Sequence, residues 1–398
     1  MSDGTIRVPA DARAETTPRR RWRVATIIGA ALLVVMAIPL SAPRAAAQGA
    51  PPAVTNVPVT LPIPEVTLQG VSCVGSRCVA VGYQCGAGGC GGFMRGAIMV
   101  STDAGQSWRA ARFPATAGFL HDVTCSGPTC LAIGMSRPGV HGSYLVVRSV
   151  NGGASWGLST LRPPVLISVS CASPRVCFAT VDSRLTAKGI AIDPEVLVSH
   201  DAGSTWQRTA IPALQEFNGA NVTCGSATSC VVTVFATESG ALTHLWLTTN
   251  SGKTWSTGAI PWRGPDDPLA LQCANGLVCI ASGSGGGGTN FVATTRSSSA
   301  QWSAATVSTW LPSVAGCATT TTCFAAGNVL VPWGGAVVDE VTVSPLRQVT
   351  VPLHAASGVP TPVAISCTAT YCVLVGALYT VSNGQATSLA PYVARWSL

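Results

Sequence analysis

Apolar runs with a period of two flank short clusters of Gly, Ser, Ala, Pro and Thr along most of this chain. This pattern is typical of β-hairpins, because side chains alternate between the two faces of a strand. The same unit returns seven times: an apolar residue, Ser or Thr and Cys, then four or five turn residues, a second Cys and a short apolar run. In two of the seven units, Gln272 and Gly316 stand where the others have Ser or Thr. The pattern therefore predicts an all-β chain built from repeats.

The spacing of the units indicates their architecture. Their first cysteines lie 52, 46, 53, 49, 44 and 50 residues apart. That is the length of a four-stranded propeller blade, with variation that loops can absorb. Residues 48–398 supply seven such units and leave no room for another domain. We therefore predict a seven-bladed β-propeller of four-stranded antiparallel blades over 48–398.

The paired cysteines predict a disulfide across each hairpin, because residues that face each other in a hairpin lie within bonding reach. Zinc is the alternative, but the spacing is longer than Cys-x2-Cys and no His follows at ligand distance. An eighth, local bridge is predicted in a Gly-rich loop of the first repeat. The predicted pairs are Cys73–Cys78, Cys85–Cys90, Cys125–Cys130, Cys171–Cys177, Cys224–Cys230, Cys273–Cys279, Cys317–Cys323 and Cys367–Cys372.

Residues 1–47 have the composition of a targeting segment. A basic region ends at Arg23, an apolar run covers 24–40, and Ala45 and Ala47 form an A-x-A site before Gln48. A cleaved signal peptide and a retained single membrane anchor through 24–40 both fit this pattern. Either one predicts a propeller outside the cytosol, secreted or tethered to the outer side of the cytoplasmic membrane, where disulfides persist.

The charge distribution argues against nucleic acid as a partner. The net charge is +7, and more than half of it comes from the arginines of residues 1–47. The remaining charge is too small and too scattered for a phosphate-binding surface. The sequence predicts no cofactor and no metal site.

A second motif, Ser/Thr-x-Asp/Asn-x-Gly-x-Ser/Thr-Trp, follows the cysteine pair in each of the first four repeats. It resembles the Asp-box, or bacterial neuraminidase repeat, of propellers in sialidases, the sortilin ectodomain and assembly factors of the photosystem II type. Because two copies carry Asn, we expect a structural role: a turn closed by the Asp or Asn, a Gly with positive φ, and a Trp between blades. The defining residues are Asp103 and Trp108, Asn151 and Trp156, Asp201 and Trp206, and Asn250 and Trp255; worn copies end at Trp302 and Trp396.

The order of the strands predicts ring closure and two distinct faces. The segment from Val54 to Pro62 resembles an outer strand, so we place it beside the last repeat, which stops after its third strand. In a four-stranded meander the disulfide hairpins and Asp-boxes share one face, and the longer, variable loops share the other. Binding usually resides on such loops. Candidate ligand residues on the predicted loops of the first two blades are Tyr83, His121, Asp122, Arg137, His141 and Tyr144.

Two functions remain open. The first is a binding or scaffold module of the cell envelope, with a protein or glycan ligand. The alternative is a glycan-active hydrolase. The sialidase resemblance implies an arginine triad for a substrate carboxylate, a Tyr with a Glu as the nucleophile, and an Asp as the acid/base. The only arginines in repeats four and five are Arg263 and Arg296, and no arginine triad is recognisable. We therefore predict no catalytic residues. Other glycosidases need two nearby carboxylates. The neighbouring acids are Asp193 and Glu195, Asp266 and Asp267, and Asp339 and Glu340.

Overall fold

The computed structural model describes much of the chain from Val54 to Leu398. The gaps are residues 56–60, 64, 87–88, 115–116, 137–143, 160–165, 182–183, 186–190, 193–194, 210, 212–216, 237–241, 264–267, 275, 277, 286–288, 297–301, 308, 330–334, 344–345, 354–357 and 383–384. The predicted signal or anchor at 24–40 lies outside the described residues. Within the described ranges, no helix has the length and apolar character needed to span a membrane.

Seven four-stranded antiparallel sheets form the structure, as predicted. Blades 1 and 2 contain β2 (Val66–Val74), β3 (Arg77–Gly86), β4 (Gly89–Ser101) and β5 (Arg109–Ala110), then β6 (Ala117–Ser126), β7 (Thr129–Ser136), β8 (Tyr144–Ser149) and β9 (Gly157–Leu158). Blade 3 contains β10 (Leu166–Cys171), β11 (Cys177–Val181), β14 (Glu195–Ser199) and β15 (Gln207–Thr209). A separate small hairpin, β12 (Arg184–Leu185) and β13 (Ala191–Ile192), lies between β11 and β14 in the chain.

The other four blades repeat the same order. Blade 4 contains β16 (Phe217–Cys224), β17 (Cys230–Ala236), β18 (Leu242–Thr248) and β19 (Ser256–Arg263). Blade 5 contains β20 (Pro268–Ala274), β21 (Val278–Gly285), β22 (Thr289–Thr295) and β23 (Trp302–Val307). Blade 6 contains β24 (Trp310–Cys317), β25 (Thr322–Val329), β26 (Ala336–Val343) and β27 (Leu346–Leu353). Blade 7 contains β28 (Val359–Cys367), β29 (Tyr371–Ser382), β30 (Gln385–Ser397) and β1 (Val54–Thr55).

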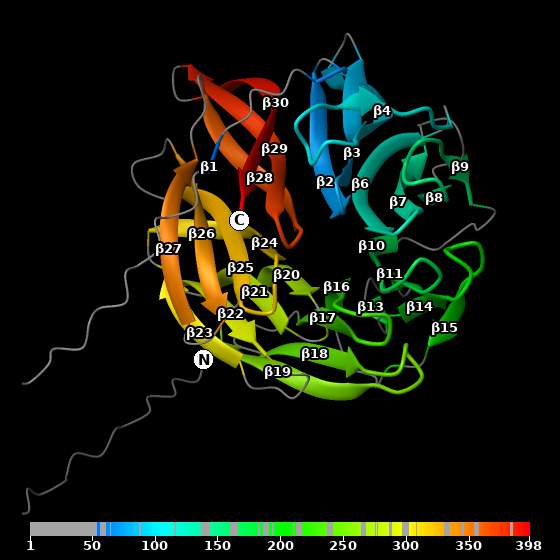
Figure 1. Ribbon diagram of the computed structural model, residues 1–398, viewed down its shortest axis with the longest axis vertical. Coiled ribbons are helices and arrows are strands. Elements are labelled where there is room, and N and C mark those ends of the chain that lie inside the picture. The colour runs from blue at the N-terminus through cyan, green and yellow to red at the C-terminus, as the bar shows by residue number, and fades with distance from the viewer. Residues whose placement is uncertain are drawn as a thin grey trace, which may run out of the picture. The chain divides into compact units, whose positions relative to one another are not determined.

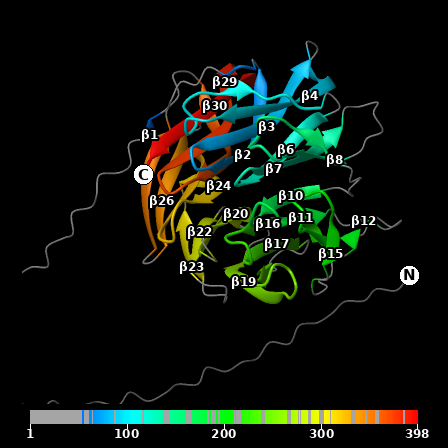
Figure 2. The same cartoon turned by 45° about the vertical axis from the view of Figure 1, so that its right-hand side comes forward.

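The first strand of each blade is the innermost, and these seven strands form the centre of the ring. Each contacts the first strand of the next blade, from β2 through β6, β10, β16, β20 and β24 to β28, and β28 contacts β2 again. Figure 1 and Figure 2 show the sheets in this order by colour. The core consists of apolar side chains that pack between adjacent blades, which is the expected arrangement when one sheet buries its faces against its neighbours.

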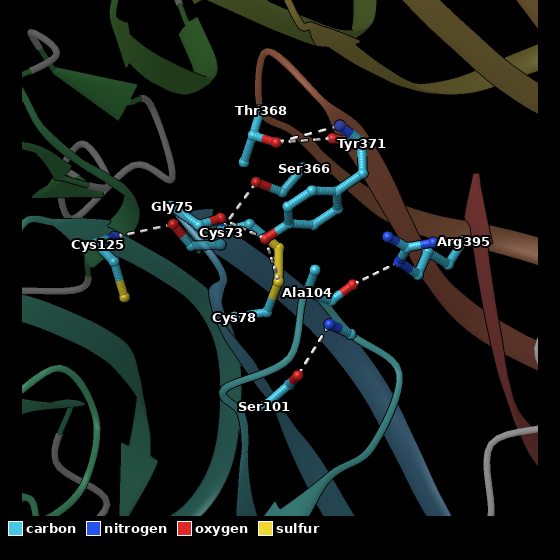
Figure 3. Close-up of a disulfide and its surroundings, with 12 residues drawn as sticks. Cys73, Gly75, Cys78, Ser101, Ala104, Cys125, Ser366, Thr368, Tyr371 and Arg395 are labelled. Carbon is cyan, nitrogen blue, oxygen red and sulfur yellow. Dashed lines mark hydrogen bonds between the residues drawn. A yellow bond between two sulfur atoms is a disulfide. The ribbon is translucent and has the colours of Figure 1, made fainter. Parts of the chain in front are cut away.

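The ring closes where β1 adds to the last blade. Val54 pairs with Trp396 and Thr55 with Arg395, so the N-terminal strand forms the outer edge of blade 7 as predicted. Blade 7 also holds blade 1 directly. The Tyr371 hydroxyl donates to the Gly75 carbonyl at 2.7 Å, and Arg395 Nε donates to the Ala104 carbonyl at 2.7 Å (Figure 3). These bonds join the last blade directly to the first.

Each blade carries one hairpin disulfide between its first two strands, which confirms seven of the predicted pairs. Their Cα atoms lie 3.9–4.1 Å apart, and each pair is directly opposed in the strand register. Loop-closure entropy gives each short bridge on the order of 2 kcal/mol. Seven disulfides indicate an oxidising compartment. Cys85 is also disulfide-bonded, but the side chain of Cys90 lies outside the described residues, so the Cys85–Cys90 pairing stays a prediction.

A belt of hydrogen bonds links the hairpins around the ring. In six blades the N–H of the first cysteine donates to a side-chain oxygen of the preceding blade, at 2.9–3.0 Å. The acceptors are Ser366, Ser72, Thr124, Ser170, Thr223 and Gln272. They occupy the position directly before a first cysteine, which explains the recurrence of Ser and Thr there. Gly316 holds the seventh position, and it has no side chain to offer the N–H of Cys367.

Every innermost strand contains an irregularity in its pairing with the second strand. In blade 2 the register shifts between Leu120 and Asp122, so His121 is an extra residue. Opposite this bulge lies Gly134, where an added Cβ would come within 1.9 Å of the Phe119 carbonyl oxygen. A glycine is required there because the backbone itself fills the space. The bulge turns one residue of the strand toward the centre of the ring, and this placement creates the site described below.

Candidate binding site

The Asp-box turns lie on the same face as the disulfide hairpins, here called the hairpin face. The Asp103 carboxylate accepts the Ser107 N–H at 2.9 Å and the Ser101 hydroxyl at 2.7 Å, so it closes its own turn. Partial desolvation works against ionisation, but hydrogen bonds from Ser107 and Ser101 outweigh it and lower the pKa of Asp103 to about 2. Asp201 makes the same bonds, and its pKa is also lowered to about 2. Asn151 closes the equivalent turn without a charge.

Each Asp-box also packs against the preceding blade. The box glycines have φ of 81–85°, and a Cβ on Gly105 or Gly153 would meet Val373 or Val79 at under 3 Å. Trp156 packs in the cluster that contains Val79 and Val100 of blade 1. The turn, its glycine and its tryptophan are therefore occupied by contacts within and between blades, which supports the structural role expected of them. The predicted worn copy at Trp396 is wrong: this residue pairs directly with Cys372 inside β30, where the intact boxes have their first Ser or Thr.

The opposite face, here called the loop face, holds most of the predicted ligand residues, but not on loops. Tyr83 lies in β3, His121 and Asp122 lie in β6, and Tyr144 begins β8. The expected loop positions of these four residues are therefore wrong, because the strands extend further toward this face than the turn signals indicated. Arg137 and His141 lie outside the described residues. The predicted Cys85–Cys90 loop belongs to the β3–β4 hairpin, in which Gly86 pairs with Gly89.

Five of the loop-face side chains form one continuous row across blades 1 and 2. The Tyr83 and Phe119 rings lie 5.1 Å apart, and the Phe119 and His121 rings stack at 5.8 Å. Phe119 pairs with Met135 in the strand register, and Met135 pairs with Tyr144, so these side chains share one face of the sheet. The Met135 side chain is 43% exposed, and the others are half-buried. We call Tyr83, Phe119, His121, Met135 and Tyr144 the aromatic–methionine row.

The row leads to a cavity at the centre of the ring. The cavity has a volume of about 340 Å³ and is lined by the seven innermost strands. His121 belongs to both, because it stacks on Phe119 and lines the cavity. Its Nε2 donates to the Ile167 carbonyl of blade 3 at 3.1 Å, which fixes the ring at the channel wall. The bulge in β6 is what places this side chain between the row and the channel.

Asp122 lies on the channel wall beside His121. Its two carboxylate oxygens accept the Val123 N–H at 2.8 Å and the Val169 N–H at 2.9 Å, and the Ser168 hydroxyl lies 3.3 Å away. Burial raises the pKa of this carboxyl, and the hydrogen bond from Val169, the neighbouring His121 and the remaining bonds offset only part of that effect. Asp122 therefore links blades 2 and 3 and also brings a carboxyl group to the cavity.

Of the candidate carboxylate pairs for hydrolysis, Asp339 and Glu340 are the one pair that lies wholly within the described residues, and they do not come together. Asp339 and Glu340 are consecutive in β26, so their side chains point to opposite faces of the sheet. Glu195 lies 3.2 Å from Arg208, whereas Asp193, Asp266 and Asp267 lie outside the described residues. The described part of the chain also contains no group of three or more His, Cys, Asp or Glu side chains that could hold a metal ion.

Sequence reasoning missed Phe119 and Met135, which complete the row. Phe119 lies between Tyr83 and His121, and Met135 links Phe119 to Tyr144. A signal for the bulge was present, because a glycine ends the apolar run after the second cysteine in several repeats. Gly82, Gly134, Gly327 and Gly376 all leave less than 2.1 Å between an added Cβ and a carbonyl oxygen of the innermost strand. These glycines mark the bulges along the sequence.

Comparison with known proteins identifies the fold. No protein-family model matches the chain, and no curated protein matches its sequence. YCF48 bound to D1 peptide is similar, with a TM-score of 0.52 and 12% identity over 87% of this chain and 96% of that chain. For YCF48 from Cyanidioschyzon merolae the TM-score is 0.53 at 12% identity, over 86% and 98%. The acylaminoacyl peptidase of Pyrococcus horikoshii has a TM-score of 0.53 at 9% identity, over 83% of this chain and 52% of that chain. Identities this low show a shared fold alone, which is the β-propeller that the repeats predict.

Proposed function

We propose that this protein is a binding module of the cell envelope, and that it captures an extended segment of another protein on the loop face of blades 1 and 2. The observation that carries the proposal is the aromatic–methionine row, whose ring contacts join blades 1 and 2 while its side chains stay partly exposed. Aromatic side chains dominate binding energy at protein interfaces, and methionine adapts to different partners. The hairpin disulfides support a location outside the cytosol.

Two further observations support a protein segment as the ligand. YCF48 has been solved bound to D1 peptide, so a propeller of this fold accepts a peptide; because fold alone does not determine function, that likeness supports the proposal only by analogy. The row also crosses β6, β7 and β8 at paired positions, so its anchors form a line across three neighbouring strands, about 5 Å apart. An extended segment that lies along this line can contact several anchors in turn.

The proposal is tested by selecting ligands from a random peptide library displayed on phage, with the secreted protein as bait. We expect selected peptides to carry apolar or aromatic residues at alternate positions. Replacing Met135 and Tyr144 together with Ser should weaken their binding about tenfold or more, as loss of interface anchors does. Val150→Ser is the matched control, because Val150 is 55% exposed but lies on the Asp-box turn of the same blade, on the hairpin face.

A defined result would overturn this function. If the double variant kept full affinity while Val150→Ser lost it, the hairpin face would be the binding surface. The Asp-box residues Asp103 and Asp201 belong to that face, and the proposal gives them no part in ligand contact. A glycan array that retained the protein at a site insensitive to Met135 and Tyr144 would likewise remove the protein segment as the ligand.

A further inference from the structure

The inner edge of each blade presents backbone groups to the channel. In an antiparallel pair, alternate residues direct both N–H and C=O away from the partner strand. The cysteine N–H groups lie on this outward side, as their bonds to the preceding blade show. The residue two positions earlier lies on the same side, and in blade 2 the Val123 N–H indeed bonds outward to Asp122. Each blade therefore offers two edge amides, at a cysteine level and at an upper level nearer the loop face.

At the upper level, three adjacent blades have acceptors for these amides. Val123 and Val169 donate to the two oxygens of Asp122 at 2.8 and 2.9 Å. Val222 donates to the Ser168 hydroxyl at 3.4 Å. Blade 1 has Gly70 where blade 2 has Asp122, so Asp122 serves the amide of its own blade as well as that of the next. The edge amides of blades 2, 3 and 4 are thereby satisfied by side chains.

The four remaining blades, which are adjacent on the ring, differ at this level. Their edge amides belong to Leu271, Ala315, Ile365 and Val71, all of which line the cavity. The positions that would supply an acceptor are Ala270, Val314 and Ala364, which are apolar, and Asn221, which is polar and also lines the cavity. Among the described residues, no side chain accepts from these four amides. One half of the channel wall therefore offers free hydrogen-bond donors, and the other half carries the Asp122 carboxylate.

We propose that the central channel is a binding site for an α-ammonium group together with its adjoining carbonyl or carboxylate oxygens. The ammonium group lies against Asp122, and the oxygens accept from the edge amides of blades 5, 6, 7 and 1. A carboxylate has about four acceptor positions, and three are used by Val123, Val169 and Ser168, so one remains for the ligand. Both the amino terminus of a peptide and a free amino acid have this chemistry.

The size and position of the cavity agree with a small ligand or a chain end. A volume of about 340 Å³ lies near the lower limit of ordinary small-molecule sites, so a folded element does not fit. His121 lies where the aromatic–methionine row meets the channel. A segment bound on the row can therefore place its amino terminus beside Asp122. The channel site does not depend on the proposed function, because a free amino acid would use the same groups.

The test measures the affinity of the full-length protein for three probes by calorimetry: L-alanine, tri-L-alanine and N-acetyl-tri-L-alanine. We expect acetylation to weaken binding of the tripeptide about tenfold or more, because it removes the charge that faces Asp122. Binding of tri-L-alanine alone identifies a peptide terminus as the source, and equal binding of L-alanine identifies a free amino acid. Equal affinity for the free and acetylated tripeptides, or no binding of any probe at millimolar concentration, would overturn the inference.

Variants separate the site from general effects on folding. Asp122→Asn should remove the preference for the free amine, and Gln69→Trp should block the channel from a lining position that makes no bond in the belt. If Asp122→Asn fails to fold, Gln69→Trp alone decides: unchanged tri-L-alanine affinity contradicts the site. Asp103→Asn is the control on the hairpin face. The Met135 and Tyr144 variant should keep its affinity for L-alanine, so the channel site and the proposed function can fail separately.

Discussion

Replacing Gly134 with Ala tests whether the bulge in blade 2 is required for the fold. An added Cβ would lie 1.9 Å from the Phe119 carbonyl oxygen and 2.9 Å from the Leu120 Cα. Both are backbone atoms of β6, so no change of side-chain rotamer can relieve the clash. The strand must move or lose its bulge, and either change withdraws His121 from the channel wall.

The expected loss of stability follows from this clash, which no side-chain movement can relieve. Overpacking a well-packed interior costs about 1–3 kcal/mol, and we expect Gly134→Ala at the upper end, about 3 kcal/mol. Gly157→Ala is the matched control in the same blade, because a Cβ at Gly157 meets no atom within 4 Å. That change should stay within about 0.5 kcal/mol of the parent protein.

Urea unfolding followed by tryptophan fluorescence provides the assay. The urea concentration at the midpoint should fall for Gly134→Ala by about 3 kcal/mol divided by the slope m, and m itself should not change. The midpoint for Gly157→Ala should not move measurably. If the two variants had equal midpoints, the close approach of Gly134 to β6 would not constrain the fold, and the argument for all four bulge glycines would fail.

Three other outcomes are expected. Asp103→Ala should lower stability by about 0.5–2 kcal/mol through loss of the turn bonds, which chemical denaturation measures, while ligand affinity stays unchanged. Asp103 and Asp201 have folded pKa values of about 2 against an ordinary 3.8, so their stabilisation is complete above about pH 5 and is lost as the pH falls toward 2. The double Asn variant should show a flatter acid limb in a pH series of melting curves. Because both groups are largely exposed, solvent screening keeps this effect modest. Non-reducing peptide mapping should recover a Cys85–Cys90 peptide; a link from Cys85 to another repeat would contradict the predicted pairing.

The hydrolase alternative also has a direct test. The purified protein should show no turnover of sialosides or aryl glycosides, since no arginine triad is recognisable in the sequence and Asp339 and Glu340 point to opposite faces of their sheet. Turnover that disappears on replacing Asp193, Glu195, Asp266 or Asp267 would establish the alternative and remove the binding module as the primary function.

The architecture could be predicted from the sequence because the same short motifs recur in every blade or in most blades. Cysteines at blade spacing fix the hairpins, and Asp or Asn with Gly and Trp fixes the turn that follows the third strand. The closing strand at Val54 was also predictable, since the last repeat lacks an outer strand of its own. These features depend on contacts between residues close in sequence, or on a count of strands, and both can be read along the chain.

The candidate site was less predictable because it depends on register between strands and on packing between blades. Tyr83 and Phe119 meet only because blades 1 and 2 are adjacent, and Met135 joins them only through the pairing of β6 with β7. The sequence predicts a loop at His121 and Asp122, whereas the structure has a bulge inside a strand there. The marker of this bulge, Gly134, lies on a different strand.

Hydrogen exchange with a library-selected peptide locates the ligand on the ring. Binding on the loop face should slow exchange in 117–121 and 131–136, which carry the aromatic–methionine row, and should leave the Asp-box turns at 101–108 and 149–156 unchanged. Slower exchange confined to the Asp-box turns, with 117–121 and 131–136 unaffected, would place the ligand on the hairpin face and contradict binding on the loop face.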